Sequence, residues 1–205
     1  MLSKRLQEIY DLIPSCQIVA DIGTDHGFIP EKLLLEKKCQ KVIASDISKQ
    51  SLSKTIEVRD KNNFGQNLLC VVSDGFKNFS ENTKIDCVVI AGMGGNEIVK
   101  ILKEKPTSIV VDQFILQPNQ HHNNLRDYLL SQNYIIEKDY VLQDKEKFYY
   151  LIKCKKVTNV IDKTDLKNNL NANGVVKNKK VLLQSLNNFK MFSNKTIAPL
   201  KLFSL

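Results

Sequence analysis

The stretch IVADIGTDHG, residues Ile18–Gly27, places two carboxylates, two glycines and a histidine directly after a short apolar run. The apolar residues 18–22 predict a buried strand, and a helix is expected over about 30–38, with Pro30 in its first turn. The polar residues between them therefore belong to a strand-to-helix turn. In open α/β sheets, ligands bind beyond the carboxyl ends of the strands, so this turn is the first candidate for a binding site.

Short apolar runs alternate with helical patterns along the rest of the chain. Further strands are expected over 41–45, 68–73, 85–91 and 112–117, and helices over 4–13, 48–62, 96–103 and 122–132. Ser3 and Ser48 are expected to cap the helices that follow them. This alternation predicts an α/β fold with a doubly wound, mostly parallel, Rossmann-like sheet. Two longer strands, 134–142 and 147–154, are separated by only four residues, which predicts a C-terminal antiparallel hairpin.

The positive charge of the chain is concentrated at its C-terminal end. Residues 153–205 carry eleven lysines and two aspartates, a net charge of +9, whereas residues 1–152 carry 19 basic and 20 acidic residues. We therefore expect a globular domain over residues 1–156 and a short, basic, mainly helical extension over 157–205, with one helix at about 180–193. Such a basic segment attracts polyanions, most often nucleic acid, although it can also simply keep a protein soluble.

Composition argues against several classes of protein. No apolar run approaches the roughly 18 residues of a membrane span, and the amphipathic start of the chain lacks the apolar centre of a secretory signal. A cytoplasmic protein without membrane contact is therefore expected. The five cysteines are scattered and form no CxxC pair, so neither a metal site nor a disulfide framework is predicted. No protein partner is predicted.

Acidic residues at the ends of three predicted strands indicate which chemical groups a ligand would carry. The first turn lacks the G-x-G-x-x-G pattern of dinucleotide sites, and Asp25 within it would repel a pyrophosphate but suit a cationic amino group. Asp46 is placed to accept hydrogen bonds from ribose hydroxyls, and Asp74 to accept one from an adenine amino group. S-Adenosylmethionine (AdoMet) combines these three parts. Taken singly, each acid also fits an ordinary turn or a helix cap.

Five short motifs carry a resemblance to a known family. They are LSKRL at 2–6, VADIGTDHGFIP at 19–30, SDGF at 73–76, IAGMGG at 90–95 and LQPN at 116–119. In order and spacing, over roughly residues 1–155, the chain resembles the bacterial tRNA adenine-22 N1-methyltransferases, which are class I AdoMet-dependent enzymes. Members of this family often have Tyr where this chain has Phe28. They usually end in a long helical domain, in place of the shorter extension here.

The resemblance implies which residues meet the cofactor and the tRNA. The residues implied at the AdoMet site are Asp21, Gly23, Asp46, Ile47, Asp74, Gly75, Ala91 and Gly92. Those implied in tRNA binding are Lys4, Arg5, Phe28, Met93, Gln117 and Pro118. The catalytic residues implied are Asp25, Asn119 and His26.

The chemistry of N1 methylation needs no strong base. Adenine N1 carries a free lone pair at neutral pH, and methylation makes the ring cationic, so a carboxylate such as Asp25 would orient the base and stabilise the developing charge. Asn119 would accept a hydrogen bond from the N6 amino group, and Phe28 would stack on the base. His26 either assists or caps the following helix. The basic pair at 4–5 either contacts phosphate or forms a solvated helix face.

Two other functions remain compatible with the sequence. The first is an AdoMet-dependent methyltransferase that acts on another RNA base, a small molecule or a protein. The second is a nucleotide-binding protein or an NAD-dependent dehydrogenase, against which the missing G-x-G-x-x-G pattern and the terminal hairpin count.

Overall fold

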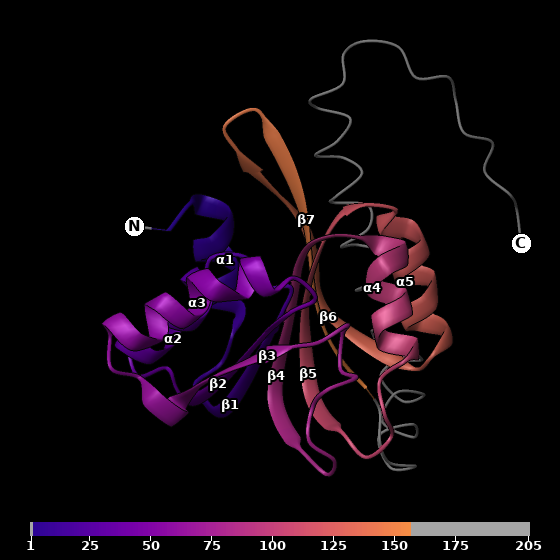
Figure 1. The fold of residues 1–205 in the computed structure, drawn as a ribbon. Coiled ribbons are helices and arrows are strands. Elements are labelled where there is room, and N and C mark those ends of the chain that lie inside the picture. The colour runs from indigo at the N-terminus through magenta and orange to yellow at the C-terminus, as the bar shows by residue number, and fades with distance from the viewer. Residues whose placement is uncertain (1, 157–205) are drawn as a thin grey trace, which may run out of the picture. The chain divides into compact units, whose positions relative to one another are not determined.

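The structure, a computed structural model, describes residues 2–156, which form a seven-stranded mixed sheet between two layers of helices (Figure 1). The strands are β1 (Cys16–Ile22), β2 (Cys39–Asp46), β3 (Leu68–Val72), β4 (Lys84–Gly94), β5 (Val110–Gln120), β6 (Tyr134–Asp144) and β7 (Lys147–Lys156). The helices are α1 (Lys4–Leu12), α2 (Phe28–Leu35), α3 (Lys49–Lys61), α4 (Gly95–Lys103) and α5 (His122–Ser131). Figure 1 shows α1, α2 and α3 on one face of the sheet and α4 and α5 on the other.

The expected doubly wound sheet with a C-terminal antiparallel hairpin is confirmed. The strand order is β3-β2-β1-β4-β5-β7-β6, in which β1 to β5 are parallel and β7 is antiparallel to both of its neighbours. The order of the parallel strands reverses between β1 and β4, where ligands of such sheets bind. The expected extension over 157–205, including its helix at 180–193, lies outside the described residues.

The helix starts follow local sequence signals. The side chains of Ser3 and Ser48 each accept a hydrogen bond from a backbone N–H in the first turn of the next helix, so both predicted caps are confirmed. The helix α2 begins at Phe28, earlier than expected, because Gly27 adopts the left-handed conformation (φ 69°) and turns the chain directly into the helix.

The departures from the expected boundaries that matter for a binding site lie at the carboxyl edge of the parallel strands. The strands β4 and β5 extend past their expected ends, to Gly94 and Gln120, with register irregularities around Met93. The hairpin is also tighter than expected, because Asp144 pairs with Lys147 and leaves two residues in the connection instead of four. The motif at 116–119 therefore lies wholly within β5, and all but the last residue of the motif at 90–95 lies within β4.

Two apolar layers attach the helices to the sheet. Under α4 and α5, Ile98 and Leu125 are fully buried against sheet residues such as Val88. Under α1 and α2, Ile9 and Leu33 are equally buried. Burial of apolar surface stabilises the fold by about 25 cal/mol per Å², so these layers hold the strand ends, and the site built on them, in a fixed arrangement.

The five cysteines are all free and all lie in the described part of the chain. Three of them are buried and two are partly buried. Burial raises the pKa of Cys16 to about 11 and that of Cys39 to about 12, which keeps both thiols protonated and poorly nucleophilic at neutral pH. Within residues 2–156, no helix is both long and apolar enough to cross a membrane.

Two glycines, Gly94 and Gly95, lie at the junction of β4 and α4, and only Gly95 is closely packed against another segment. A Cβ atom on Gly95 would overlap the backbone carbonyl oxygen of His121, in the turn before α5. A Cβ atom on Gly94 would meet only the Gln120 side chain, at 3.5 Å, and Gly94 has an extended backbone (φ −69°, ψ 146°) that any residue adopts. Glycine at position 95 therefore lets the two turns approach each other.

We expect Gly95→Ala to lower the free energy of unfolding by about 2–4 kcal/mol, because the backbone of the β5–α5 turn must move to admit the methyl group. Gly94→Ala is the matched control and should change it by less than about 1 kcal/mol. Urea unfolding followed by circular dichroism measures both variants. Equal losses for the two variants would contradict the close approach at position 95.

Candidate functional site

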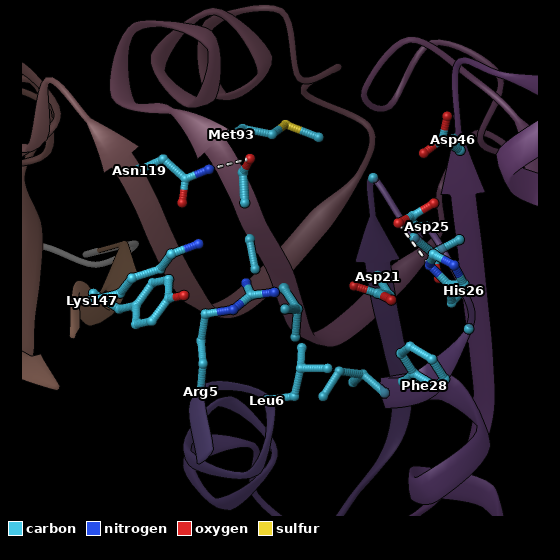
Figure 2. Close-up of a pocket in the computed structure, with 18 of the residues that line it drawn as sticks. Arg5, Leu6, Asp21, Asp25, His26, Phe28, Asp46, Met93, Asn119 and Lys147 are labelled. Carbon is cyan, nitrogen blue, oxygen red and sulfur yellow. Dashed lines mark hydrogen bonds and ion pairs between the residues drawn. The ribbon is translucent and has the colours of Figure 1, made fainter. Parts of the chain in front are cut away.

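A cavity of about 760 Å³ opens at the carboxyl edge of the sheet, within the range of roughly 300–1,000 Å³ that is usual for small-molecule sites. Its walls come from the ends of β1, β2, β4 and β5, from α1 and from the start of β7 (Figure 2). The predicted site residues that line it are Arg5, Asp21, Gly23, Asp25, His26, Phe28, Asp46, Ala91, Gly92, Met93 and Asn119. The structure thus brings together polar residues at the ends of β1, β2, β4 and β5, but not those that follow β3.

Asp21, at the end of β1, places a buried carboxyl group in the cavity wall. Only 7% of the residue is exposed, and desolvation raises its pKa to about 6, with a further contribution from the Asp46 carboxylate. The neighbouring Thr24 is buried too, and its hydroxyl acts on the Asp21 carboxyl group in the opposite direction, lowering that pKa. The two carboxyl groups of this part of the wall favour a cationic ligand.

Two glycines bring the backbone directly to the cavity. Gly23 (φ 81°) and Gly92 (φ 83°) both adopt the left-handed conformation that disfavours other residues. A Cβ atom on Gly23 would overlap the end of the Met93 side chain. A Cβ atom on Gly92 would meet only Arg5 Nη1, at 4.0 Å, so Gly92 leaves space beside the backbone for a ligand, whereas at Gly23 the Met93 side chain occupies it.

Asp25, His26 and Lys54 form a charged cluster at the edge of the cavity. Asp25 Oδ2 lies 2.7 Å from His26 Nδ1, and Lys54 Nζ lies 3.0 Å from His26 Nε2 and 3.6 Å from Asp25 Oδ1. An ammonium can only donate, so the imidazole accepts at Nε2 and donates from Nδ1 to Asp25. The sequence analysis did not find Lys54, because nothing distinguishes it from the other polar residues of α3.

The same cluster presents an aromatic surface. The rings of His26 and Phe28 are stacked, with 5.2 Å between their centroids and 1° between their planes. Phe28 is 48% exposed, which is unusual for a large apolar side chain at a cavity wall. The Asp25 carboxylate is also largely exposed and remains accessible to a ligand.

A chain of hydrogen bonds crosses the floor of the cavity from α1 to β4. Arg5 Nη1 donates to Gln117 Oε1 (2.7 Å), and Gln117 Nε2 donates to Asn119 Oδ1 (3.0 Å). Asn119 Nδ2 then donates to the Gly92 carbonyl oxygen (2.7 Å), as Figure 2 shows. Gln117 itself is fully buried, so its side chain holds Arg5 and Asn119 in place from behind the cavity.

Three hairpin residues, Lys147, Phe148 and Tyr149, line the cavity although the sequence analysis assigned them no role. The strand β7 runs antiparallel to β5, and the register pairs Leu116 of β5 with Ile152 of β7. Residues that precede this pair in β7 therefore project past the carboxyl end of β5, toward the cavity. The antiparallel direction of the predicted hairpin was the signal that could have identified them.

Several predicted site residues lie outside the lining of this cavity. They are Lys4, Ile47, Asp74, Gly75, Gln117 and Pro118. Asp74 follows β3 at the edge of the sheet, and its carboxylate pairs with Lys77 at 2.5 Å, which lowers its pKa. The Lys4 ammonium donates to the Gln143 carbonyl oxygen (2.8 Å). Ile47 is 71% exposed. The ligand contacts assigned to these residues stay predictions.

No group of three or more His, Cys, Asp or Glu side chains within residues 2–156 is arranged to hold a metal ion. The charged groups of the cavity are instead carboxylates on the β1–β2 side and cations on the side of α1 and β7. Such a site can bind an organic ligand that carries both signs of charge.

Comparison with known proteins identifies the domain. Residues 2–152 match the family model described as a methyltransferase domain. The chain is 31% identical to the tRNA (adenine(22)-N(1))-methyltransferase of Bacillus subtilis over 154 residues, which are 74% of this chain and 63% of that enzyme. It therefore spans less than two thirds of the length of that relative.

Solved structures agree with this match. The structure of TrmK from Mycoplasma capricolum, in complex with S-adenosylhomocysteine, is 31% identical with a TM-score of 0.69, covering 76% of this chain and 69% of that one. The B. subtilis m1A22 tRNA methyltransferase TrmK is 28% identical with a TM-score of 0.71, covering 77% of this chain and 67% of that one. The chain therefore belongs to the TrmK-like tRNA (adenine-22 N1)-methyltransferase family, with a class I AdoMet-dependent methyltransferase domain.

Proposed function

We propose that this chain transfers the methyl group of AdoMet to N1 of adenine 22 in tRNA. The observation that carries the proposal is the acid-walled cavity at the reversal of strand order, in a chain similar to enzymes of this activity. The tRNA substrate and the target base come from those relatives. The cavity supplies the independent chemical argument.

The residues on the β1–β2 side of the cavity fit AdoMet. The cofactor carries an ammonium and a sulfonium, and the carboxyl groups of Asp21 and Asp46 offset positive charge on this wall. Gly92 leaves room for the cofactor beside the backbone of β4. When bound, AdoMet supplies a methyl group that is activated by its attachment to a positively charged sulfur.

The residues around the mouth of the cavity fit an adenine ring. Phe28 offers an exposed face on which a base can stack, an interaction worth roughly 1–3 kcal/mol. Asn119 Oδ1 accepts one hydrogen bond from Gln117 and has a second lone pair for the N6 amino group of adenine. Asp25 is the acid beside this aromatic surface. Base stacking and two polar contacts together would orient N1.

Asp25 then serves the transfer itself by electrostatics. The lone pair of N1 attacks without prior deprotonation, and the ring gains a positive charge as the new N–C bond forms. A nearby carboxylate stabilises that charge. His26 and Lys54 hold the carboxylate at 2.7 Å and 3.6 Å, so they position Asp25 and need not exchange a proton with the substrate.

The tRNA must expose its Watson–Crick edge, because N1 is hidden in a base pair. The basic residues 153–205 would attract tRNA phosphates through their net charge of +9. The domain boundary at 156 and the role of this segment stay predictions, since the segment lies almost wholly outside the described residues.

Methylation of a defined tRNA tests the proposal. We expect the protein to transfer one labelled methyl group from AdoMet to a tRNA transcript with adenine at position 22, and mass spectrometry of the digested RNA should find it at N1 of that base. A transcript with guanine at position 22 is the control and should remain unlabelled. Labelling of the control at the same rate would assign the activity to another base.

We expect Asp25→Ala to lower kcat by at least about 100-fold, because it removes the carboxylate that stabilises the charged product ring. Binding of S-adenosylhomocysteine should remain, since Asp21 and Asp46 are intact. Asp60→Ala removes an exposed acid of α3 that pairs with Arg59, and this control should retain full activity. Near-normal turnover by Asp25→Ala would rule out its assigned role.

We expect the affinity for AdoMet to fall as the pH is lowered from 7 to 5. Asp21 has a pKa raised to about 6, so it is ionised above that pH and loses its charge below it. A bound cation favours the ionised form, so binding near pH 6 should release a proton. Isothermal titration calorimetry in buffers of different ionisation enthalpy measures both effects.

Asp21→Asn is the matched variant for this pH dependence. It should bind AdoMet more weakly at pH 7 and with an affinity that varies little between pH 5 and pH 7. Circular dichroism at pH 5 establishes that the protein remains folded. The same pH dependence in Asp21→Asn as in the unmodified protein would assign the titration to another group.

A further inference from the structure

The proposed function gives the cationic wall of the cavity no specific contact, beyond the expectation from the sequence that Arg5 takes part in tRNA binding. Arg5 comes from α1 and Lys147 from the start of β7, and Figure 2 shows both side chains directed into the cavity from the side opposite Asp21 and Asp25. Opposite walls of the cavity therefore carry opposite charge, with carboxylates on one wall and two cations on the other.

Neither cation is neutralised by the protein. The Arg5 guanidinium donates to the neutral Gln117 side chain and lies 5.4 Å from the centre of the Tyr149 ring, but it forms no ion pair within residues 2–156. Within the same residues, the Lys147 ammonium has neither a hydrogen bond nor an ion pair. Lys147 is exposed and Arg5 is partly buried, and together they give this wall of the cavity a positive potential that favours an anion.

Arg5 is held ready for such a ligand. Its backbone N–H donates to Asp144 Oδ2 (3.2 Å), which ties the start of α1 to the hairpin, and its Nη1 is fixed by the buried Gln117. The other N–H groups of the guanidinium remain available for a bidentate contact. Lys147, the first residue after the hairpin turn, adds a point charge on a flexible stem.

We propose that Arg5 and Lys147 form a subsite for an RNA phosphate group next to the target adenosine. The proposal rests on the proposed function, which puts the base between Phe28 and Asn119. Arg5 reaches Asn119 through Gln117, so the two cations flank the base on the side away from the carboxylates. A nucleotide that enters the cavity base first brings its backbone phosphate to this wall.

Lys147→Ala tests the subsite through the salt dependence of tRNA binding. The slope of log affinity against log salt should become shallower by about 1, and the affinity at moderate salt should fall about tenfold. The affinity for S-adenosylhomocysteine should not change. Lys84→Ala is the matched control, because it removes a lysine that pairs with Asp112 at the opposite edge of the sheet, and it should leave the slope unchanged.

A mononucleotide isolates the phosphate itself. Adenosine 5′-monophosphate should bind the protein loaded with S-adenosylhomocysteine more tightly than adenosine does, as measured by NMR titration. Lys147→Ala should abolish that difference, and Lys147→Arg should keep it. Both measurements are made without turnover, so they stand even if no methyl group reaches adenine 22.

Three results would overturn the subsite. The first is an unchanged salt slope in Lys147→Ala, and the second is equal binding of adenosine and its monophosphate by the unmodified protein. The third is a loss of affinity for S-adenosylhomocysteine in Lys147→Ala that matches the loss for tRNA, which would assign the charge to the carboxylate of the cofactor.

Discussion

The reversal of strand order between β1 and β4 is the constraint on which the site depends. After β1 the chain crosses to α2 on one face of the sheet, and after β4 it crosses to α4 on the other, so the two connections diverge. The divergence leaves the carboxyl ends of both strands uncovered. Every group of the candidate site is attached to one of these ends, to a neighbouring strand or to an element that borders them.

The divided charge of the cavity follows from this topology. The carboxyl groups of Asp21 and Asp46 end two neighbouring parallel strands, whereas Arg5 and Lys147 reach the cavity from α1 and from a strand of opposite direction. Burial of Asp21 disfavours its charged form, which opposes folding at neutral pH. A binding site accounts for such a residue. A cationic ligand would offset the charge of the carboxylate, which the protein alone does not offset.

The sequence predicted the fold well because each strand and helix carried its own local signal. The sequence also indicated that the glycines and acids after β1 belong to a binding site, because these residue types are unusual directly after a buried strand. The direction of the predicted hairpin pointed to the start of its second strand, but which residues there reach the cavity, Lys147 and Tyr149 among them, depends on the register between β5 and β7. Nor could the sequence show that Lys77, one turn beyond Asp74, would pair with that carboxylate outside the cavity. A contact between distant segments decides the first case, and a side-chain pair three residues apart decides the second.

Arg5 sets the donor and acceptor direction of every hydrogen bond in the chain below the cavity. Arginine can only donate, so Gln117 must turn its carbonyl oxygen toward Arg5 and its amide nitrogen toward Asn119. Asn119 must then turn its oxygen toward Gln117 and its nitrogen toward the Gly92 carbonyl oxygen. The amide of Asn119 is thereby fixed with an acceptor lone pair to spare, which is what recognition of an adenine amino group requires. A residue on the first helix thus determines the hydrogen-bonding character of a residue two strands beyond β1.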